Sequence, residues 1–210
     1  MSPVLAVRLD SDGDVLLTGP AVRALASAGE PVDLLASPAG TAAGRLLPDV
    51  RQVLTFAAPW SGYRPPPVDR GEVEQLVGTL AAGGYRRAVV FTSFHQSPLP
   101  MALLCRLAGI PFVAATSVDY PGSLLDVRHV RPDGAHEVEA MLDLARAAGG
   151  ALPEGDDGRL AVRGPLPDPG PLLPAAPYVV LHPGASVPAR GTTVEHAAAL
   201  TGRLQRLLAP

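Results

Sequence analysis

Lysine is absent from this sequence, so all 17 basic residues are arginines, and the 20 acidic residues bring the formal net charge to -3. A chain with this balance lacks the basic field that general nucleic-acid binding requires, so nucleic acid is not an expected partner. Cysteine occurs once, as Cys105 in the apolar pattern MALLCRLAG, which excludes a disulfide framework. We expect this thiol to be a buried core group rather than a nucleophile.

Long hydrophobic runs are missing as well. No stretch approaches the roughly eighteen apolar residues of a membrane span, and the N-terminus lacks a basic segment followed by an apolar one. We therefore expect neither a transmembrane helix nor a signal peptide. The expected location is the cytoplasm, where the protein could also contact the inner face of the membrane.

Short apolar runs and longer helical patterns alternate through the first 150 residues. The apolar runs VLAVRL, PVDLLA, VRQVLTF, RAVVFTS and PFVAAT predict strands, and the segments between them show helical periodicity. Parallel strands need crossover connections, which helices supply. Residues 1–150 are therefore predicted to form an α/β, Rossmann-like parallel sheet with helices on both faces. The expected helices cover residues 14–28, 73–82, 99–108 and 136–148, with a shorter one that ends at residue 47.

The composition changes after residue 150. Residues 151–176 are rich in proline and glycine and predict a linker without helix or central strand. After it, YVVLHPGAS predicts a strand that enters a glycine-containing loop, and a helix is expected at about 193–208. Residues 177–210 would then be the first βα unit of a second, incomplete domain. One strand and one helix cannot bury their own apolar faces, so another chain or a dimer could complete this domain.

Three carboxylates follow the first apolar run, at Asp10, Asp12 and Asp14. A calcium loop is excluded because Val15 and Ala21 occupy the positions of its glycine and its bidentate glutamate. A dinucleotide-binding turn is excluded because GxGxxG is absent. Asp14 could be a base at the ligand-binding edge of the sheet, or an acid that stabilises a helix N-terminus, and the spacing alone favours the second interpretation. We interpret Asp10 and Asp12 as capping or solvated groups.

Four segments resemble glycosyltransferase family 9, the ADP-heptose:lipopolysaccharide heptosyltransferases. VRLDSDGDVLLTGPAVRAL resembles the N-terminal signature of this family, and FTSFHQSPLPMALLCRLAGIPFVAAT resembles its fourth and fifth strands with the helix between them. HEVEAMLDLARAAG resembles the helix that closes its first domain, and VVLHPGASVPARGTTVEHAAAL resembles the start of its second domain. These segments cover nearly the whole chain in the order of the family.

The resemblance implies the N-terminal domain of a two-domain GT-B fold, truncated at its C-terminal end. It also implies an inverting transfer of a heptose-type sugar from an ADP-sugar to a cell-surface glycan or glycolipid. By position, Asp14 would be the catalytic base, and Gly184, Ser186 and Arg190 would bind the donor phosphates. No metal and no cofactor besides the nucleotide-sugar substrate are implied, and the incomplete donor domain predicts poor transfer by this chain alone.

Several other residues are candidates for acceptor binding. Ser93, His95 and Gln96 end a strand on the same edge as Asp14, so they could hydrogen-bond an acceptor sugar. The other predicted acceptor contacts are Asp12 and Gly13. Tyr120, Arg128 and Arg131 lie in an irregular segment that could meet an anionic acceptor, whereas Arg86 and Arg87 are expected to be solvated and His136 and Glu137 to begin a helix.

Two further functions remain open from the sequence. One is a truncated module that binds an acceptor or a partner protein without catalysis. The other is an unrelated Rossmann-like protein such as a small oxidoreductase, although the missing GxGxxG argues against it.

Overall fold

The computed structural model describes residues 2–62, 64–93, 95–170, 173, 178–185 and 188–208. The chain divides into two compact units, residues 1–164 and residues 165–210.

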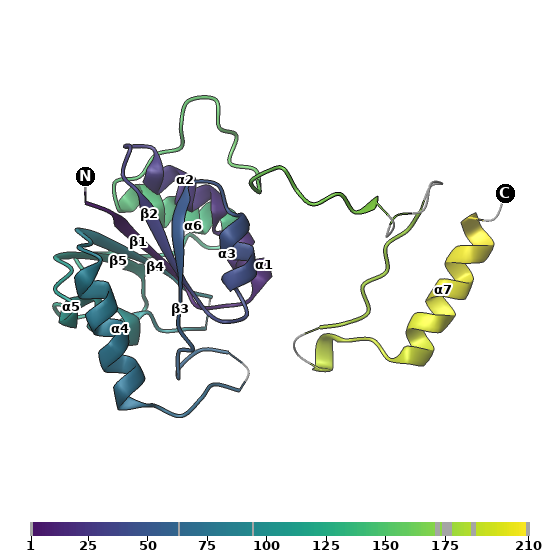
Figure 1. Ribbon diagram of the computed structural model, residues 1–210, viewed down its shortest axis with the longest axis horizontal. Helices are drawn as coiled ribbons and strands as arrows, with labels where there is room; N and C mark the ends of the chain where they lie inside the picture. The colour runs from purple at the N-terminus through teal and green to yellow at the C-terminus, as the bar shows by residue number, and fades with distance from the viewer. Residues whose placement is uncertain are drawn as a thin grey trace. The chain divides into compact units, whose positions relative to one another are not determined.

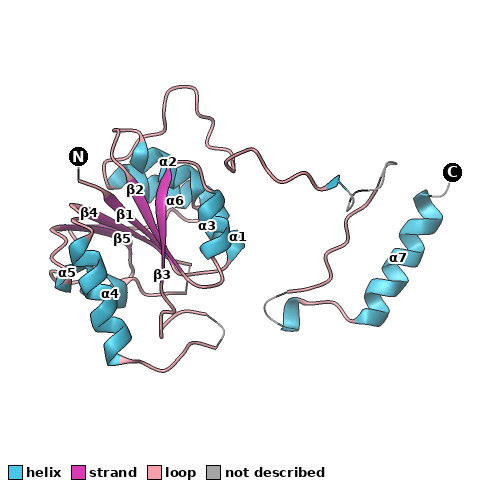
Figure 2. Ribbon diagram, viewed as in Figure 1, coloured by secondary structure: helices cyan, strands magenta, loops and turns pink. Residues whose placement is uncertain are grey.

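The first unit is built on a six-stranded sheet in which every strand is parallel to its neighbours (Figures 1 and 2). The strand order is β3-β2-β1-β4-β5-β6, so the chain reverses its direction of travel across the sheet between β1 and β4. Ligands of open α/β sheets bind at such a switch point, beyond the carboxyl ends of the strands. The strands are β1 (Val4–Arg8), β2 (Val32–Ala36), β3 (Val50–Thr55), β4 (Arg87–Phe91), β5 (Phe112–Thr116) and β6 (Val127–His129).

Helices cover both faces of this sheet (Figure 1). One core contains apolar side chains from α2 and α6, and the other contains those of α4 and α5. β1, β2 and β4 are buried along their whole length, which explains their nearly continuous apolar sequences. The helices are α1 (Asp12–Leu17), α2 (Gly19–Ala26), α3 (Thr41–Leu46), α4 (Arg70–Ala82), α5 (Leu99–Leu107) and α6 (Glu137–Ala147).

The predicted α/β sheet of the first domain is confirmed, with two local differences. The helix expected at 14–28 is divided at Thr18 into α1 and α2, and Pro20 lies in the first turn of α2, where its missing N–H costs nothing. β6 lies in a segment expected to be irregular, because a strand of three residues is too short to show periodicity. Cys105 is completely buried as predicted, and burial raises the pKa of its thiol to about 12.

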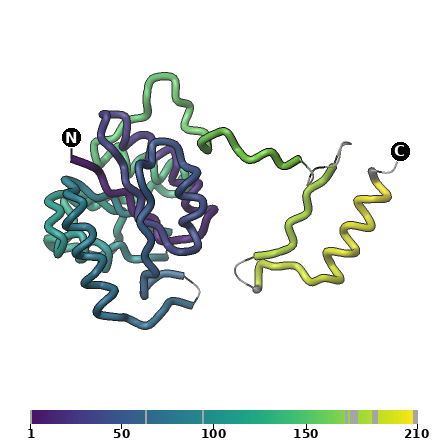
Figure 3. Tube along the Cα trace, viewed as in Figure 1, coloured from purple at the N-terminus to yellow at the C-terminus, as the bar shows by residue number. Residues whose placement is uncertain are grey.

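The first compact unit extends past the last helix of the sheet to Gly164. The N–H of Ala151 donates to the carbonyl of Ala24 (2.9 Å), and Arg23 forms an ion pair with Asp156 (2.6 Å). Arg163 donates to the carbonyls of Leu47 and Val50 (2.8 and 2.7 Å). Much of the segment expected to be a linker is therefore held against the sheet domain, and Figure 3 shows its path.

The second unit contains a short 3-10 helix, Pro188–Arg190, and the helix α7, Val194–Leu208. α7 agrees with the helix expected at about 193–208. The strand expected at YVVLHPGAS is not formed, because residues 178–185 adopt neither strand nor helix. A strand needs a neighbour for its backbone hydrogen bonds, and the described residues of this unit supply none. Across the described residues of the whole chain, no helix has the length and apolar character of a membrane span.

Candidate functional site

A buried arginine organises the carboxyl edge of the sheet. Arg8 is the last residue of β1, and its side chain is completely buried. Its Nε lies 2.9 Å from Asp10 Oδ2, and its Nη2 lies 3.3 Å from both Asp14 Oδ1 and Glu137 Oε1. Because a buried charge is costly unless it is paired, the arginine brings three carboxylates to the end of β1.

Asp14 lies in the first turn of α1, and its carboxylate is engaged in two directions. Its Oδ2 accepts hydrogen bonds from Ser11 Oγ (2.7 Å) and from the Ser11 backbone N–H (3.2 Å). Its Oδ1 faces Arg8, and the side chain is one-third exposed, at 34%. The interpretation of Asp14 as a helix-capping acid is therefore confirmed. Its role as a base remains a prediction. The carboxylate is accessible and held in one orientation, as this role would require.

Asp10 is not the capping or solvated group that we expected. Only 8% of its side chain is exposed, because it lies between Arg8 and the loop after β4. Gln96 Nε2 donates to its Oδ1 (2.6 Å), and Ser93 Oγ donates to its Oδ2 (3.3 Å). Burial raises the pKa of Asp10, while Arg8 and the Gln96 hydrogen bond oppose this shift. The expectation failed because exposure depends on β4, which is distant in sequence.

Asp12 and Gly13, both predicted acceptor contacts, are exposed at the start of α1. Asp12 Oδ1 accepts a hydrogen bond from the backbone N–H of Ala43 in α3 (3.0 Å). This contact joins the first turns of two helices, so the Asp12 carboxylate has a structural role within the first unit. Neither residue lines the cavity at the carboxyl ends of β4, β5 and β6.

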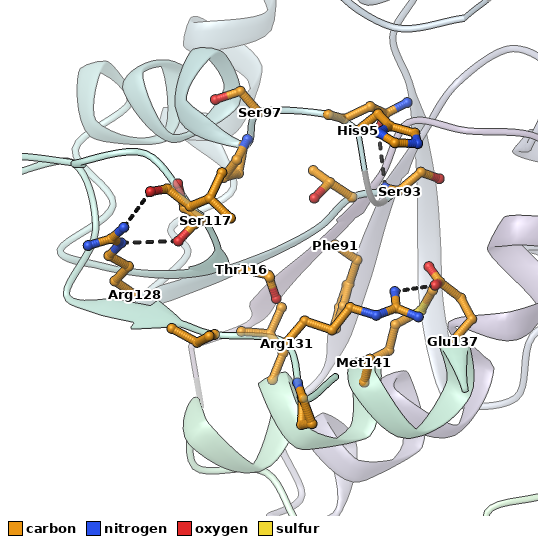
Figure 4. Close-up of a pocket in the computed structure, with 18 of the residues that line it drawn as sticks. Phe91, Ser93, His95, Ser97, Thr116, Ser117, Arg128, Arg131, Glu137 and Met141 are labelled. Carbon is orange, nitrogen blue, oxygen red and sulfur yellow. Dashed lines mark hydrogen bonds and ion pairs between the residues drawn. The ribbon is translucent and has the colours of Figure 1, made fainter. Parts of the chain in front are cut away.

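A cavity of about 780 Å³ opens beside this network at the carboxyl ends of β4, β5 and β6 (Figure 4). Three predicted acceptor residues, Ser93, His95 and Gln96, line it together. Glu137 and Met141 of α6 also contribute to the lining. The size and the mixture of polar and apolar groups suit a small organic ligand.

The same cavity is lined by Arg128 and Arg131, two of the residues that we expected to contact an anionic acceptor. Arg131 pairs with Glu137 and donates to the carbonyl of Ala135 (2.8 Å). Arg128 donates only to backbone carbonyls, those of Ser117 (3.0 Å) and Val118. Among the described residues no carboxylate forms an ion pair with Arg128, so its positive charge is available to a bound anion.

Arg8 and Glu137 are the site residues that the sequence analysis missed. Glu137 was predicted only as the start of a helix, and His136 does cap α6 by accepting a hydrogen bond from the Val138 N–H (3.3 Å). A signal for Arg8 was present, because an arginine inside the apolar run VLAVRL requires a partner if the strand is buried. The sequence contained no such signal for Glu137, because Glu137 and its partner Arg8 are 129 positions apart.

Arg87 corrects another expectation, because it is buried rather than solvated. Its Nη2 forms an ion pair with Glu30 Oε2 (2.6 Å), and its Nη1 donates to the carbonyl of Ala148 (2.8 Å). Arg86 does remain more than half exposed, at 57% of its side chain.

The predicted donor-phosphate residues belong to the second unit. Arg190 ends the 3-10 helix and is exposed, and Gly184 lies in the exposed loop before it. Ser186 lies outside the described residues. The Thr192 N–H donates to the Pro183 carbonyl (3.1 Å), which brings the two ends of this loop together. Among the residues that the structure describes, no three potential metal ligands form a cluster.

No family model and no curated protein match the sequence. Solved structures do match the fold. The chain is 21% identical to ADP-heptose lps heptosyltransferase II of E. coli, with a TM-score of 0.55, over 68% of this chain and 40% of that one. It is 21% identical to E. coli heptosyltransferase WaaC with ADP, with a TM-score of 0.52, over 75% of this chain and 51% of that one.

A glycosyltransferase of family 9 from Veillonella parvula is 11% identical, with a TM-score of 0.53, over 77% of this chain and 44% of that one. The chain thus spans about half or less of the length of these enzymes. At such identities the likeness concerns the fold, which agrees with the six-stranded parallel sheet. The chain therefore has the Rossmann-like α/β fold found in the heptosyltransferases and in a glycosyltransferase of family 9.

Proposed function

We propose that this chain provides the acceptor side of an inverting glycosyltransferase of family 9. The reaction would transfer a heptose-type sugar from an ADP-sugar to a cell-surface glycan or glycolipid. The observation that carries the proposal is the placement of Asp14, which is accessible and held by Arg8 at the end of β1, next to the switch point of the sheet. Glu137, which pairs with the same arginine, lines the cavity of mixed polar and apolar character. The similarity in fold to heptosyltransferases supports it.

In this mechanism Asp14 removes the proton from the attacking hydroxyl of the acceptor. The new bond forms at the anomeric carbon of the donor sugar while the bond to the diphosphate breaks, and ADP leaves. A carboxylate is a weak base near neutral pH, so its orientation by Ser11 and Arg8 would matter more than its basicity. Arg190 would stabilise the negative charge of the departing diphosphate.

The acceptor would occupy the cavity lined by Ser93, His95 and Gln96. The guanidinium of Arg128 supports an acceptor that carries a negative group, because no described carboxylate neutralises it. Val118, Tyr120 and Val130 are exposed near it in sequence, which would allow contact with the lipid part of a glycolipid at the inner face of the membrane.

The proposal is tested in two steps with the full chain. Calorimetric titration with an ADP-sugar should give saturable binding that weakens in Arg190→Ala. With the acceptor and any missing part of the donor domain supplied by a partner chain, Asp14→Asn should lower transfer about 10²- to 10⁴-fold, the usual contribution of a general base. Unchanged transfer by Asp14→Asn would exclude Asp14 as the base.

The second candidate function is an acceptor-binding module without catalysis. The observation that favours it is the second unit, whose described residues include α7 and the 3-10 turn Pro188–Arg190 but no strand. The part of this unit that the structure describes would offer few contacts to a nucleotide. Acceptor binding in the cavity, together with no ADP-sugar binding by a folded chain, would support this alternative.

A further inference from the structure

Three polar side chains form a chain of hydrogen bonds behind one wall of the cavity. Thr116 ends β5 and His129 ends β6, and Thr116 Oγ1 lies 2.7 Å from His129 Nδ1. His129 Nε2 lies 3.0 Å from Oδ2 of Asp143, which belongs to α6. The imidazole is only 7% exposed, so these two partners surround a buried ring.

When the ring of His129 is neutral, the carboxylate of Asp143 determines the direction of both hydrogen bonds. A carboxylate can only accept, so the neutral ring of His129 carries its proton on Nε2 and donates it to Asp143. Nδ1 then has a lone pair and no proton. Thr116 must therefore donate its single hydroxyl proton to Nδ1, and its oxygen keeps only lone pairs for any other partner.

Thr116 lines the cavity, as the close-up in Figure 4 shows. Its Oγ1 forms no other hydrogen bond within the described part of the chain. We propose that Thr116 is a specificity-determining residue of this cavity, which accepts a hydrogen bond from an O–H or N–H group of the ligand and donates none. The identification of that group as a free sugar hydroxyl rests on the proposed function.

Arg128 gives the cavity the opposite preference, because a guanidinium can only donate. A ligand that fits both residues presents a donor at Thr116 and an acceptor at Arg128. A sugar whose hydroxyl is methylated or replaced by hydrogen at the Thr116 position lacks the donor. Such a sugar would leave Oγ1 of Thr116 without a hydrogen-bond partner, and it should therefore bind more weakly.

The first test is a spectroscopic one on the full chain near pH 8, where an ordinary imidazole is neutral. The ¹⁵N NMR signals of the His129 ring should show a protonated Nε2 and an unprotonated Nδ1. In Asp143→Ala the ring of His129 should no longer favour the tautomer with the proton on Nε2. In Asp143→Glu the ring should still favour this tautomer. A protonated Nδ1 in the unchanged chain would overturn the proposal.

The second test uses two small probes of similar size, glycerol and 1,2-dimethoxyethane. Glycerol can donate hydrogen bonds, and the diether can only accept them. Glycerol should shift the backbone NMR signals of Thr116 and Ser117. The diether should bind about tenfold more weakly than glycerol. Thr116→Ser should retain this preference, and Thr116→Val should lose it without loss of the fold.

Three results would overturn the inference: equal binding of both probes, no shift by glycerol near Thr116, or an undiminished preference in Thr116→Val. Neither test involves the donor, Asp14 or Arg190. A failure of the glycosyltransferase proposal would appear instead in the ADP-sugar titration and the Asp14→Asn assay, so the two outcomes are distinguishable.

Discussion

At the scale of single residues, Arg8 has the largest influence on the site. One guanidinium nitrogen, Nη2, lies within 3.3 Å of Asp14, Glu137 and Ser93, while the buried Nη1 has no hydrogen-bond partner among the described residues. Arg8 thus holds groups from the turn after β1, from α1, from α6 and from the loop after β4. If it were removed, these carboxylates would lose the cation that permits their proximity.

We expect Arg8→Met to lower the free energy of unfolding by about 3 kcal/mol or more, because it removes the buried cation that pairs with the buried carboxylate of Asp10 and with the partly buried ones of Asp14 and Glu137. Arg8→Lys should lose less, because it keeps the charge. Urea denaturation measures both. The matched control is Arg70→Met, whose exposed pair with Glu74 should contribute about 0.5 kcal/mol or less. An Arg8→Met variant as stable as this control would contradict the structural role of Arg8.

At the scale of elements, the packing of α1 against the loop before α3 depends on Gly40. A Cβ at this position would lie 2.6 Å from Val15 Cγ2 and 2.9 Å from the carbonyl oxygen of Asp10. Such distances require the backbone next to the site to shift. Gly78, in the exposed part of α4, is the opposite case, since a Cβ there would meet nothing within 4 Å.

Alanine at these two glycines should therefore have opposite effects. Gly40→Ala is expected to destabilise the protein by about 1–3 kcal/mol through overpacking. Gly78→Ala should stabilise it by about 0.5–1 kcal/mol, because alanine has the higher helix propensity. Thermal unfolding followed by circular dichroism compares them. If Gly40→Ala unfolded at or above the midpoint of the unchanged protein, the close approach at Gly40 would not limit packing.

At the scale of the whole molecule, residues 151–164 extend the first unit by polar contacts. Arg23 holds Asp156 through two hydrogen bonds (2.6 and 2.8 Å) and also donates to the carbonyl of Arg159 (2.9 Å). The hydrogen bond from Arg23 lowers the pKa of Asp156 to about 2, assisted by the Gly158 N–H. A lowered pKa means that the unfolded chain binds the proton more readily than the folded one.

The stabilisation from Asp156 should be complete above its unfolded pKa of 3.8 and should disappear as the pH falls toward about 2. Only 10% and 16% of the Arg23 and Asp156 side chains are exposed, and we expect Asp156→Asn, which removes the charge of this pair, to cost about 1 kcal/mol at neutral pH. It should also flatten the loss of stability between these pH values in urea denaturation. Asp157→Asn is the control, because Asp157 pairs with an exposed arginine. Equal pH profiles of both variants would rule out the role of Asp156.

Much of the fold could be predicted because the relevant signals are local. The helix expected at 99–108 is observed at Leu99–Leu107, and the one expected at 136–148 at Glu137–Ala147. α4 begins three residues before the expected Val73, because Asp69 accepts a hydrogen bond from the Glu72 N–H (2.9 Å). The prediction of a strand after residue 177 was wrong, because a strand forms only where a neighbouring strand pairs with its backbone, and this pairing is not a local property of the sequence.

By itself, the sequence determined the parallel α/β sheet, the buried thiol of Cys105 and the position of Asp14 after the first strand, since periodicity and connection length encode these features. Only the tertiary structure decided which polar groups meet. Arg8 pairs with Glu137, Asp10 is buried by Gln96, and Thr116 is hydrogen-bonded to His129 because the parallel sheet brings the carboxyl ends of β1, β4, β5 and β6 to one edge. Contacts between residues so distant in sequence leave no periodic signal, so they follow from the fold.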